Sequence, residues 1–314
     1  MLSVSHIRYP KVVREIPLHK GRNVMRYEFP DSLSNDFEGY SVLLNFHEKT
    51  RNLFLDEVIL DFKRTSWFEA NLCAVLGAVL NSVENDLNIV RIENLIPKIE
   101  RLFRRNYFLG HFGDMKIRDL YKTAVKYRKF RVNEEKLFKN YLDFELLAKA
   151  VMPDMSNLLR KKINESIFEI FNNAVIHGDC QNIFSCGQYF PTKKRLDFTI
   201  VDIGVSIKQR VDEFLRQKLS GEEAIQWAVT KGHTTRTGNI PGGLGFSLIR
   251  EFLEKNDGKI QIISGNGFWE QTGKNAKSSR YPYDFPGTIV NLEFNIDDKC
   301  HYYLLSEIKE EDIF

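Results

Sequence analysis

The sequence predicts a mixed α/β protein built from two domains. Short apolar runs alternate with helical apolar patterns between residues 57 and 103, which is typical of βαβα units. Farther on, a long helical pattern over residues 155–178 precedes an alternating strand pattern that ends at Asp202. The chain has 314 residues, which suggests about two domains, and the pattern changes near residue 130. We therefore expect domains over residues 1–130 and 131–314.

The composition excludes several classes of protein. Hydrophobic residues make up 43% and charged residues 28%, and the formal net charge is +3, so neither disorder nor a collagen-like repeat is expected. Four cysteines are too few for a disulfide framework. The longest strongly apolar stretch, residues 70–80, is shorter than the ~20 residues that a membrane-spanning helix needs. The first residues lack the apolar core of a signal peptide. We expect a cytoplasmic protein with reduced thiols and no membrane partner.

Positive charge is concentrated in residues 98–139. This segment holds thirteen Lys or Arg and five Asp or Glu, a local balance of +8. Aromatic residues are interleaved with the charges: Tyr107, Phe108, Phe112, Tyr121, Tyr127 and Phe130. Such a mixture is found in nucleic-acid-binding proteins. Two amphipathic helices with buried aromatics and solvated charges explain it equally well, and we favour them; nucleic acid stays the alternative partner.

The first domain is expected to alternate strands and helices. Residues 57–62 are a short apolar run suited to a buried strand. Residues 68–83 carry apolar side chains at a helical period, and residues 88–92 resemble a second strand. Pro97 stands where the first turn of a further helix is expected.

Over residues 40–115, this region resembles a STAS domain, the fold of anti-sigma-factor antagonists. The stretches LDFKRTSWFEANLCAVLGAVL and IVRIENLIPKIERLFRRNYF carry the resemblance. Phosphorylated STAS domains have a Ser or Thr at the start of the helix after the first of these strands. Asn71 occupies that position here, and Thr65 and Ser66 fall on the preceding turn. The resemblance therefore implies a regulatory or docking domain without that phosphorylation site.

The helix expected over residues 155–178 carries a polar stripe. Glu165, Glu169, Asn173 and His177 follow one another at intervals of four, so they share one helical face. A carboxylate can accept a proton from water, and an amide oxygen beside it can ligate Mg²⁺. The exposed polar face of a core helix would show the same pattern.

The strand expected over residues 196–202 ends in a carboxylate. Asp202 is followed by Gly204, an arrangement in which the carboxylate can accept from an exocyclic amine while the glycine allows a flat ring to approach the backbone. An ordinary turn is the alternative explanation for so short a pattern.

Residues 231–245 form a polar, glycine-rich segment that runs into a helical pattern. Free backbone N–H groups and the dipole at a helix N-terminus favour phosphate. His233 in this segment is either a phosphate contact or a solvated side chain. The spacing fits neither a P-loop nor a dinucleotide-binding fingerprint. Two strands, over residues 259–264 and 288–294, are expected to follow.

The order of these motifs resembles the GHKL ATPase superfamily, which contains type II topoisomerases, heat-shock chaperones, histidine kinases and mismatch-repair ATPases. The resemblance covers about residues 135–296. It implies a Bergerat-type α/β sandwich, with a mixed sheet covered by helices on one face. It also implies that ATP and Mg²⁺ are the cofactors and that a lid over residues 206–241 closes on the nucleotide.

The resemblance assigns roles residue by residue. Glu169 corresponds to the base that activates water and Asn173 to the Mg²⁺ ligand. The residues that it assigns to the nucleotide are Asn173, His177, Asp202, Gly204, Thr234, Thr235, Arg236, Gly242, Gly243, Leu244, Gly245 and Thr288. Within this set, Asp202 recognises adenine, the glycines hold phosphate and Arg236 contacts the terminal phosphate. One position departs from the family pattern Asp-x-Gly-x-Gly, because Ser206 replaces the second glycine.

Two classes of function remain open after ATP binding. The first is an enzyme that hydrolyses ATP or transfers its γ-phosphoryl group; we expect an ATPase, with a Ser/Thr protein kinase of the anti-sigma-factor type as an alternative. The second is a non-hydrolysing, nucleotide-gated interaction module. A histidine autokinase is disfavoured, because no acceptor His in a suitable helical context precedes the second domain. In each case the expected partner is another protein or a second copy of the chain.

Overall fold

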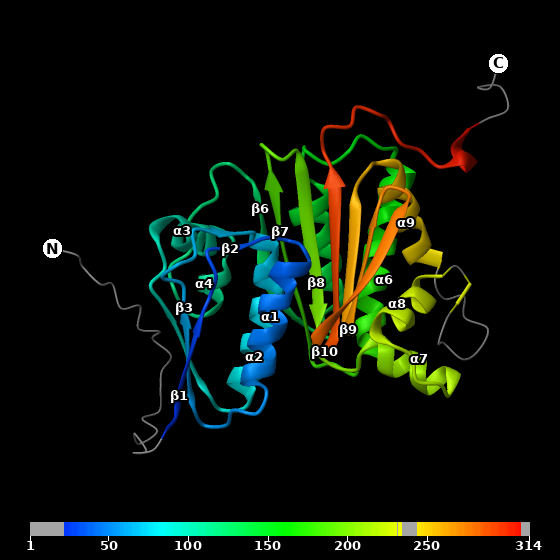
Figure 1. The fold of residues 1–314 in the computed structure, drawn as a ribbon. Coiled ribbons are helices and arrows are strands. Elements are labelled where there is room, and N and C mark those ends of the chain that lie inside the picture. The colour runs from blue at the N-terminus through cyan, green and yellow to red at the C-terminus, as the bar shows by residue number, and fades with distance from the viewer. Residues whose placement is uncertain (1–21, 231, 234–243, 309–314) are drawn as a thin grey trace. The chain divides into compact units, whose positions relative to one another are not determined.

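A computed structural model describes residues 22–230, 232–233 and 244–308 (Figure 1). The protein is a mixed α/β protein. It divides into two compact units: of the described residues, unit 1 contains 22–129 and 184–188, and unit 2 contains 130–183, 189–230, 232–233 and 244–308. None of the helices in the described residues is long and apolar enough to cross a membrane.

Unit 1 is organised around a three-stranded parallel sheet of order β1-β3-β5. Its strands and helices are β1 (Val24–Glu28), β2 (Ser32–Leu33), α1 (Phe37–Thr50), β3 (Glu57–Asp61), β4 (Trp67–Phe68), a 3₁₀ turn (Ala70–Leu72), α2 (Cys73–Asn85), β5 (Ile89–Glu93), α3 (Pro97–Arg105), α4 (Phe108–His111) and most of β6 (Ala124–Arg131). The alternation predicted for residues 57–103 is confirmed, including a helix that begins at Pro97.

Local chemistry explains the helices of unit 1. α1 begins where the Asp36 side chain accepts a hydrogen bond of 2.9 Å from the Gly39 N–H. α2 is apolar almost all round and is buried over most of its length, as expected of a core helix. Phe103 of α3 packs edge-on against Phe62 and Phe68, with ring centroids 5.7 and 5.0 Å apart.

The expectation of two helices across residues 98–139 is wrong in part. α3 ends at Arg105 and α4 at His111, residues 112–123 contain no helix or strand, and β6 follows as a strand. Basic residues interrupt the two-residue alternation that is expected of a strand in residues 124–131, so the sequence pattern did not reveal β6. The predicted burial of the aromatics holds for Phe108, Tyr127 and Phe130, whereas Tyr121 is exposed.

Unit 2 combines long helices with long strands. Its main elements are α5 (Glu135–Tyr141), a π-helical turn (Leu142–Leu147), α6 (Asn157–His177), the ends of β7 (Asn182–Phe190), β8 (Arg195–Asp202), α7 (Ile207–Leu215), α8 (Gly221–Val229), α9 (Leu244–Lys255), β9 (Lys259–Thr272) and β10 (Asn275–Asn295), followed by a short 3₁₀ turn (Leu305–Glu307). Strands β8, β10 and β9 are consecutive neighbours in one sheet of this unit. The β8–β10 and β10–β9 pairs are antiparallel.

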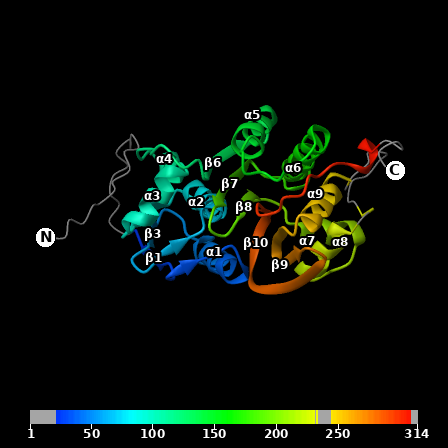
Figure 2. The ribbon, with the colours of Figure 1, turned by 90° about the horizontal axis from the view of Figure 1, so that it is seen from above.

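The helix predicted over residues 155–178 and the strand predicted to end at Asp202 are confirmed. α6 begins where the Ser156 hydroxyl accepts a hydrogen bond of 3.0 Å from the Leu159 N–H. It packs against α9 and β8, and α8 packs against β9. Figure 2 shows α6 and α9 on the same side of β8, β10 and β9.

β9 and β10 are much longer than the predicted strands over residues 259–264 and 288–294. They continue as a hairpin whose outer pairs run from Asn275 opposite Thr272 to Arg280 opposite Gly267. Residues 275–280 of this extension are exposed and carry no apolar alternation. Backbone hydrogen bonds, and not an apolar face, hold residues 275–280 in the strand, so a search for alternating apolar residues could not predict them.

Candidate functional site

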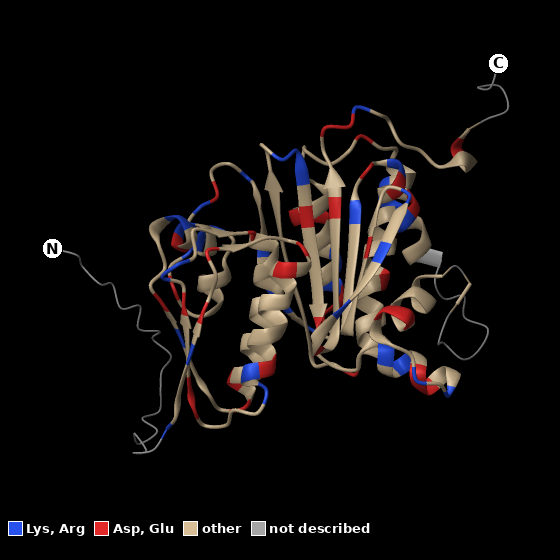
Figure 3. Cartoon of the chain, in the orientation of Figure 1, with Lys and Arg blue, Asp and Glu red and all other residues tan. Residues whose placement is uncertain are grey.

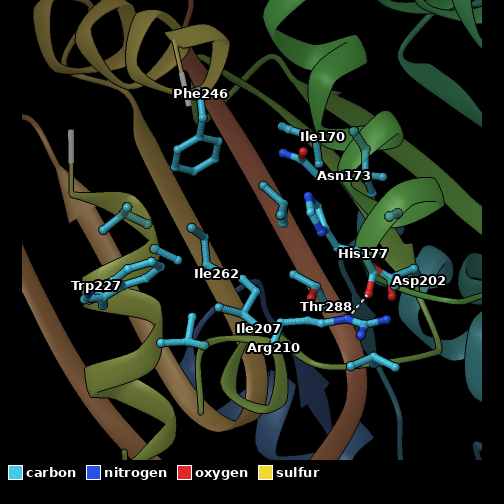
Figure 4. A pocket seen from close by; sticks show the side chains of 18 of the residues that line it. Ile170, Asn173, His177, Asp202, Ile207, Arg210, Trp227, Phe246, Ile262 and Thr288 are labelled. Atoms are coloured by element: carbon cyan, nitrogen blue, oxygen red, sulfur yellow. Dashed lines mark hydrogen bonds between the residues drawn. The ribbon is translucent and has the colours of Figure 1, made fainter. Parts of the chain in front are cut away.

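Unit 2 encloses a cavity of about 180 Å³ between its helices and its sheet (Figure 4). The wall is mostly aliphatic. Side chains from α6, the β8 end, α7, α8, α9, β9 and β10 line it: Ile170, Asn173, Ala174, His177, Ile200, Asp202, Val205, Ile207, Arg210, Val211, Trp227, Ala228, Val229, His233, Phe246, Ile262, Thr288 and Val290, together with Gly178. Such a cavity suits a flat or aliphatic ligand oriented by a few polar groups.

Asp202 is the buried acid of this cavity. It ends β8, lies opposite Thr288 of β10 and is 5% exposed. Its Oδ1 atom has no hydrogen-bond partner among the described residues. Burial raises the pKa of the carboxyl from 3.8 to about 7, although backbone N–H groups of Thr288 and of Asp202 itself act in the opposite direction. A buried acceptor without a donor is costly to the folded protein, so this position favours a ligand that supplies one.

Glycines crowd around this carboxylate. Gly287 has φ +105°, and a Cβ there would lie 2.3 Å from the Asp202 carbonyl oxygen and 2.8 Å from Oδ1. A Cβ on Gly178 would lie 3.1 Å from the same Oδ1 atom. A side chain at either position would press on Asp202, so the glycines keep the surroundings of Oδ1 open.

Gly204 is explained by chain packing rather than by contact with the cavity. A Cβ there would lie 1.9 Å from the Gly178 carbonyl oxygen, which already accepts a hydrogen bond of 2.5 Å from the Val205 N–H. Gly204 is not among the residues that line the cavity. The glycine is therefore needed where the turn after β8 crosses the end of α6.

Thr288 presents a second acceptor, and Ser264 orients it. The Ser264 hydroxyl donates to the Gly287 carbonyl oxygen at 2.6 Å and accepts from the Ile207 N–H at 2.8 Å. It also lies 3.1 Å from the Thr288 hydroxyl. Because its one proton is used on Gly287, the Thr288 hydroxyl must be the donor in that contact. The free lone pairs of Thr288 Oγ1 remain available as acceptors.

The polar face of α6 reaches the cavity only in part. Asn173 and His177 line it, and Figure 4 shows both side chains on its α6 side. Glu169, one turn earlier, is half-buried and is not part of the lining. Glu165 is exposed and pairs with Lys162 at 2.7 Å. The four residues share a helical face, as predicted, but only the last two face the apolar cavity.

Several lining residues of α7 and α8 escaped the sequence reasoning, among them Arg210 and Trp227, and the role of His233 was left open by it. Arg210 of α7 donates from Nε to the His177 carbonyl oxygen at 2.7 Å and is 3.4 Å from Glu213. Trp227 of α8 stacks on the exposed His233, with ring centroids 4.7 Å apart. The helical spacing of Ile207, Arg210 and Val211 was the available signal for α7, since all three line the cavity.

Ser206, which replaces a glycine of the family pattern, has a local structural role. Its hydroxyl accepts a hydrogen bond of 3.1 Å from the Gln209 N–H and caps the N-terminus of α7. The departure from the pattern therefore creates a helix cap directly after the turn that follows Asp202.

The predicted phosphate-binding residues are mostly outside the described structure. Thr234, Thr235, Arg236, Gly242 and Gly243 lie outside the described residues. Leu244 and Gly245 are the first two positions of α9, and Phe246, the third, lines the cavity. Within the described part of the chain, no group of three or more His, Cys, Asp or Glu side chains is arranged to hold a metal ion.

No family model matches the chain, and no curated protein matches it in sequence. The function must therefore be inferred from the chemistry of the cavity and from the motifs that surround it.

Proposed function

We propose that unit 2 binds Mg-ATP in this cavity and hydrolyses it as an ATPase of the GHKL class. The observation that carries the proposal is the Oδ1 atom of Asp202, which has no hydrogen-bond partner among the described residues and lies in a mostly apolar cavity. Two acceptors, Asp202 Oδ1 and Thr288 Oγ1, together call for a donor on a flat, apolar ring. The exocyclic amine of adenine supplies that donor.

On this proposal, the fold has the finer architecture that the motifs suggest. Unit 2 would be a Bergerat-type α/β sandwich, which is supported by the helices on one side of β8, β10 and β9. Unit 1 would be a STAS-like docking or regulatory domain, supported by its parallel β1-β3-β5 sheet and helices. Asn71 is fully buried before α2, which fits a domain without a phosphorylation site at that position.

The residues present fit Mg²⁺ as a substrate-linked ion. Mg²⁺ in nucleotide sites is bound by one or two protein ligands together with phosphates and water, so a dedicated cluster of carboxylates is unnecessary. Asn173 faces the cavity and offers an amide oxygen for that role. When bound, the ion would neutralise phosphate charge. Glu169, one turn away, would accept a proton from the attacking water.

A second candidate function is a nucleotide-gated module that binds ATP without turnover. Glu169 is not part of the cavity lining, and this observation favours the second candidate. A Ser/Thr kinase of the anti-sigma-factor type is the remaining enzymatic alternative. In each case unit 1 would engage a protein partner or a second copy of the chain.

Equilibrium binding of ATP to the full chain tests the nucleotide site. We expect ATP to bind and GTP to bind about a hundredfold more weakly, because guanine presents a carbonyl oxygen where adenine presents its amine. Asp202→Asn should lose ATP binding. Asp197→Asn, the same change at a buried acid on β8 outside the cavity, should retain it. ATP binding that is unaffected by Asp202→Asn would refute the site.

The pH dependence of the affinity supplies an independent readout. An amine donor forms a stronger hydrogen bond with the ionised carboxylate than with the neutral carboxyl group, and the pKa of Asp202 is raised to about 7. Affinity should therefore increase as the pH rises through 7 and become constant above it. An affinity that is constant between pH 5 and pH 8 would contradict the role of Asp202 as the acceptor.

Incubation with γ-labelled ATP and Mg²⁺ separates the candidate activities. Free phosphate that is lost in Glu169→Ala would establish an ATPase with Glu169 as its base. Label on an added protein partner would establish the kinase. Bound ATP with neither product would favour the nucleotide-gated module.

A further inference from the structure

Unit 1 carries an exposed loop in which apolar and basic side chains alternate. The loop spans residues 113–122 between α4 and β6, and we call it the basic-apolar loop. Met115 and Leu120 are each 74% exposed, Tyr121 is 79% exposed and Ile117 is 40% exposed. Four large apolar side chains exposed within seven positions are unusual for a connecting loop and indicate a surface that another body covers.

The cations of the loop face solvent, while its acids are turned toward the protein. Lys116, Arg118 and Lys122 are exposed. Asp114 lies 3.2 Å from Arg104 of α3 and its side chain is only 12% exposed. Asp119 accepts from the Ala124 N–H at 2.7 Å, lies 4.0 Å from Arg105 and is 11% exposed. The outward charge of the loop is therefore positive.

Internal contacts fix the loop in this presentation. The Asp114 N–H donates to the Leu109 carbonyl oxygen at 3.1 Å, and the Ile117 N–H donates to that of Arg104 at 3.4 Å. The Lys116 ammonium lies 5.0 Å from the centre of the Tyr107 ring. Figure 3 colours Lys and Arg blue, and several blue positions fall on α3 and on the loop after α4.

We propose that the basic-apolar loop binds an anionic lipid surface, with its apolar side chains inserted at the boundary of the headgroups and its cations against the headgroup charges. Loops and helices that combine exposed apolar side chains with Lys and Arg bind membranes in this way. Three of the four exposed apolar side chains are aliphatic, and aliphatic side chains gain from acyl chains but cannot stack on bases. Within the loop only Tyr121 offers an exposed ring on which a base could stack, and the neighbouring Phe108 and Tyr127 are buried, so the surface lacks the row of aromatics that successive bases need.

The proposal differs from the expectation that the protein has no membrane partner, since binding at a surface needs no spanning helix. It is independent of the nucleotide site, because every residue that carries it lies in unit 1. Failure of ATP binding would leave it standing, and failure of lipid binding would leave the proposed nucleotide site standing.

Sedimentation of the full chain with lipid vesicles tests the proposal. The protein should bind vesicles of phosphatidylcholine mixed with phosphatidylserine and should not bind phosphatidylcholine alone. Replacing Met115 and Leu120 together by Ser should weaken binding about tenfold or more, because both side chains would otherwise leave water. Replacing Lys116 and Arg118 together by Gln should have a comparable effect and should abolish most of the salt dependence.

Exposed apolar residues elsewhere in unit 1 provide the matched control. Phe54 and Leu87 are 61% and 58% exposed but lie outside the loop. Replacing both by Ser should leave vesicle binding unchanged. An equal loss in this control, equal binding to both kinds of vesicle, or no vesicle binding would overturn the proposal.

Two further measurements decide against other occupants. If the loop variants abolish binding to single-stranded nucleic acid while the parent chain ignores vesicles, the surface is a nucleic-acid site and the proposal is wrong. If they change the oligomeric state measured by light scattering and the parent chain ignores vesicles, the occupant is a second copy and the proposal is equally wrong.

Discussion

Two buried aspartates end a strand in the two units, and their surroundings are opposite. Asp61 at the end of β3 is 7% exposed and Asp202 at the end of β8 is 5% exposed. Asp61 accepts from Arg26 at 2.6 Å, from Asn94 at 2.8 Å and from the Lys63 N–H at 3.0 Å. Asp202 has one oxygen without a partner among the described residues. The same residue at the same kind of position is a satisfied structural group in one unit and an unsatisfied one in the other.

The pKa values of the two carboxyls follow from this difference. Burial alone would raise the pKa of Asp61, but the hydrogen bonds from Asn94, Lys63 and Arg26 outweigh it and lower the pKa below 3.8. At Asp202 burial prevails and the pKa rises to about 7. Burial and strand position therefore do not determine whether a carboxylate is satisfied within the fold. The number of donors that the fold itself supplies does.

The largest effect is expected from Asp202→Asn. A raised folded pKa means that the ionised carboxylate opposes folding, so stability falls as the pH rises from about 4 to about 7. The substitution removes this penalty and should stabilise the ligand-free protein at pH 8 by up to about 4 kcal/mol, while it abolishes ATP binding. Urea unfolding of the parent protein and of the variant at pH 5 and pH 8 measures the change in stability, and equilibrium binding measures the loss of ATP binding. The gain should be clearly larger at pH 8 than at pH 5, because the penalty builds up between about pH 4 and pH 7, and equal stability changes at the two values would disprove the raised pKa.

Gly287→Ala should perturb the same carboxylate sterically. The alanine would have to adopt φ +105°, and its Cβ would lie 2.3 Å from the Asp202 carbonyl oxygen. We expect a loss of about 3 kcal/mol in the free energy of unfolding, together with weaker ATP binding. Gly113→Ala is the matched control, because that glycine has φ +92° but nothing within 4 Å of its Cβ position. It should cost only about 1 kcal/mol, which is the backbone strain alone.

Asp61→Asn should sharpen the comparison with the opposite sign. A lowered folded pKa means that the carboxylate stabilises the fold above its unfolded pKa, and that this contribution is lost as the pH falls through the folded value. The side chain of Arg26 is 42% exposed, so solvent screens much of the ion pair. We expect a loss of about 1 to 2 kcal/mol at pH 7 that disappears in strong acid, measured by the same urea titrations. A gain in stability at pH 7 would mean that the ionised Asp61, like Asp202, opposes folding.

Parts of this comparison could be predicted from the sequence, and the reason lies in how local each signal is. The β8 end and the bounds of α6 follow from alternation, helical period, the Ser156 cap and Gly178, all within a few residues of the feature they mark. The strand β6 was mistaken for helix because basic residues obscured its alternation. Ser264 of β9 forms hydrogen bonds with Gly287 of β10 and Ile207 of α7. The three residues lie on separate elements, so no local sequence pattern predicts these contacts.

The donors around Asp61 and their absence around Asp202 are likewise long-range facts. Arg26 lies 35 residues before Asp61, and Asn94 lies 33 residues after it. Neither separation corresponds to a helical or strand period. Sequence reasoning could therefore place an acid at the end of each strand, but only the tertiary structure determines which acid is satisfied.

The smallest effect is expected from Ser206→Gly, which places a glycine at the position where the GHKL pattern has one. The substitution removes the hydroxyl that caps α7, and glycine at such a position costs only a few tenths of a kcal/mol. ATP affinity should be unchanged, because Ser206 does not line the cavity. If the second glycine serves as a hinge for lid closure, ATP turnover should nevertheless rise. Ser220→Gly, which removes the cap of α8 instead, should lower stability similarly without changing turnover. Equal changes in turnover in the two variants would attribute the effect to loosened helix ends, and the serine after Asp202 would then have no role beyond capping.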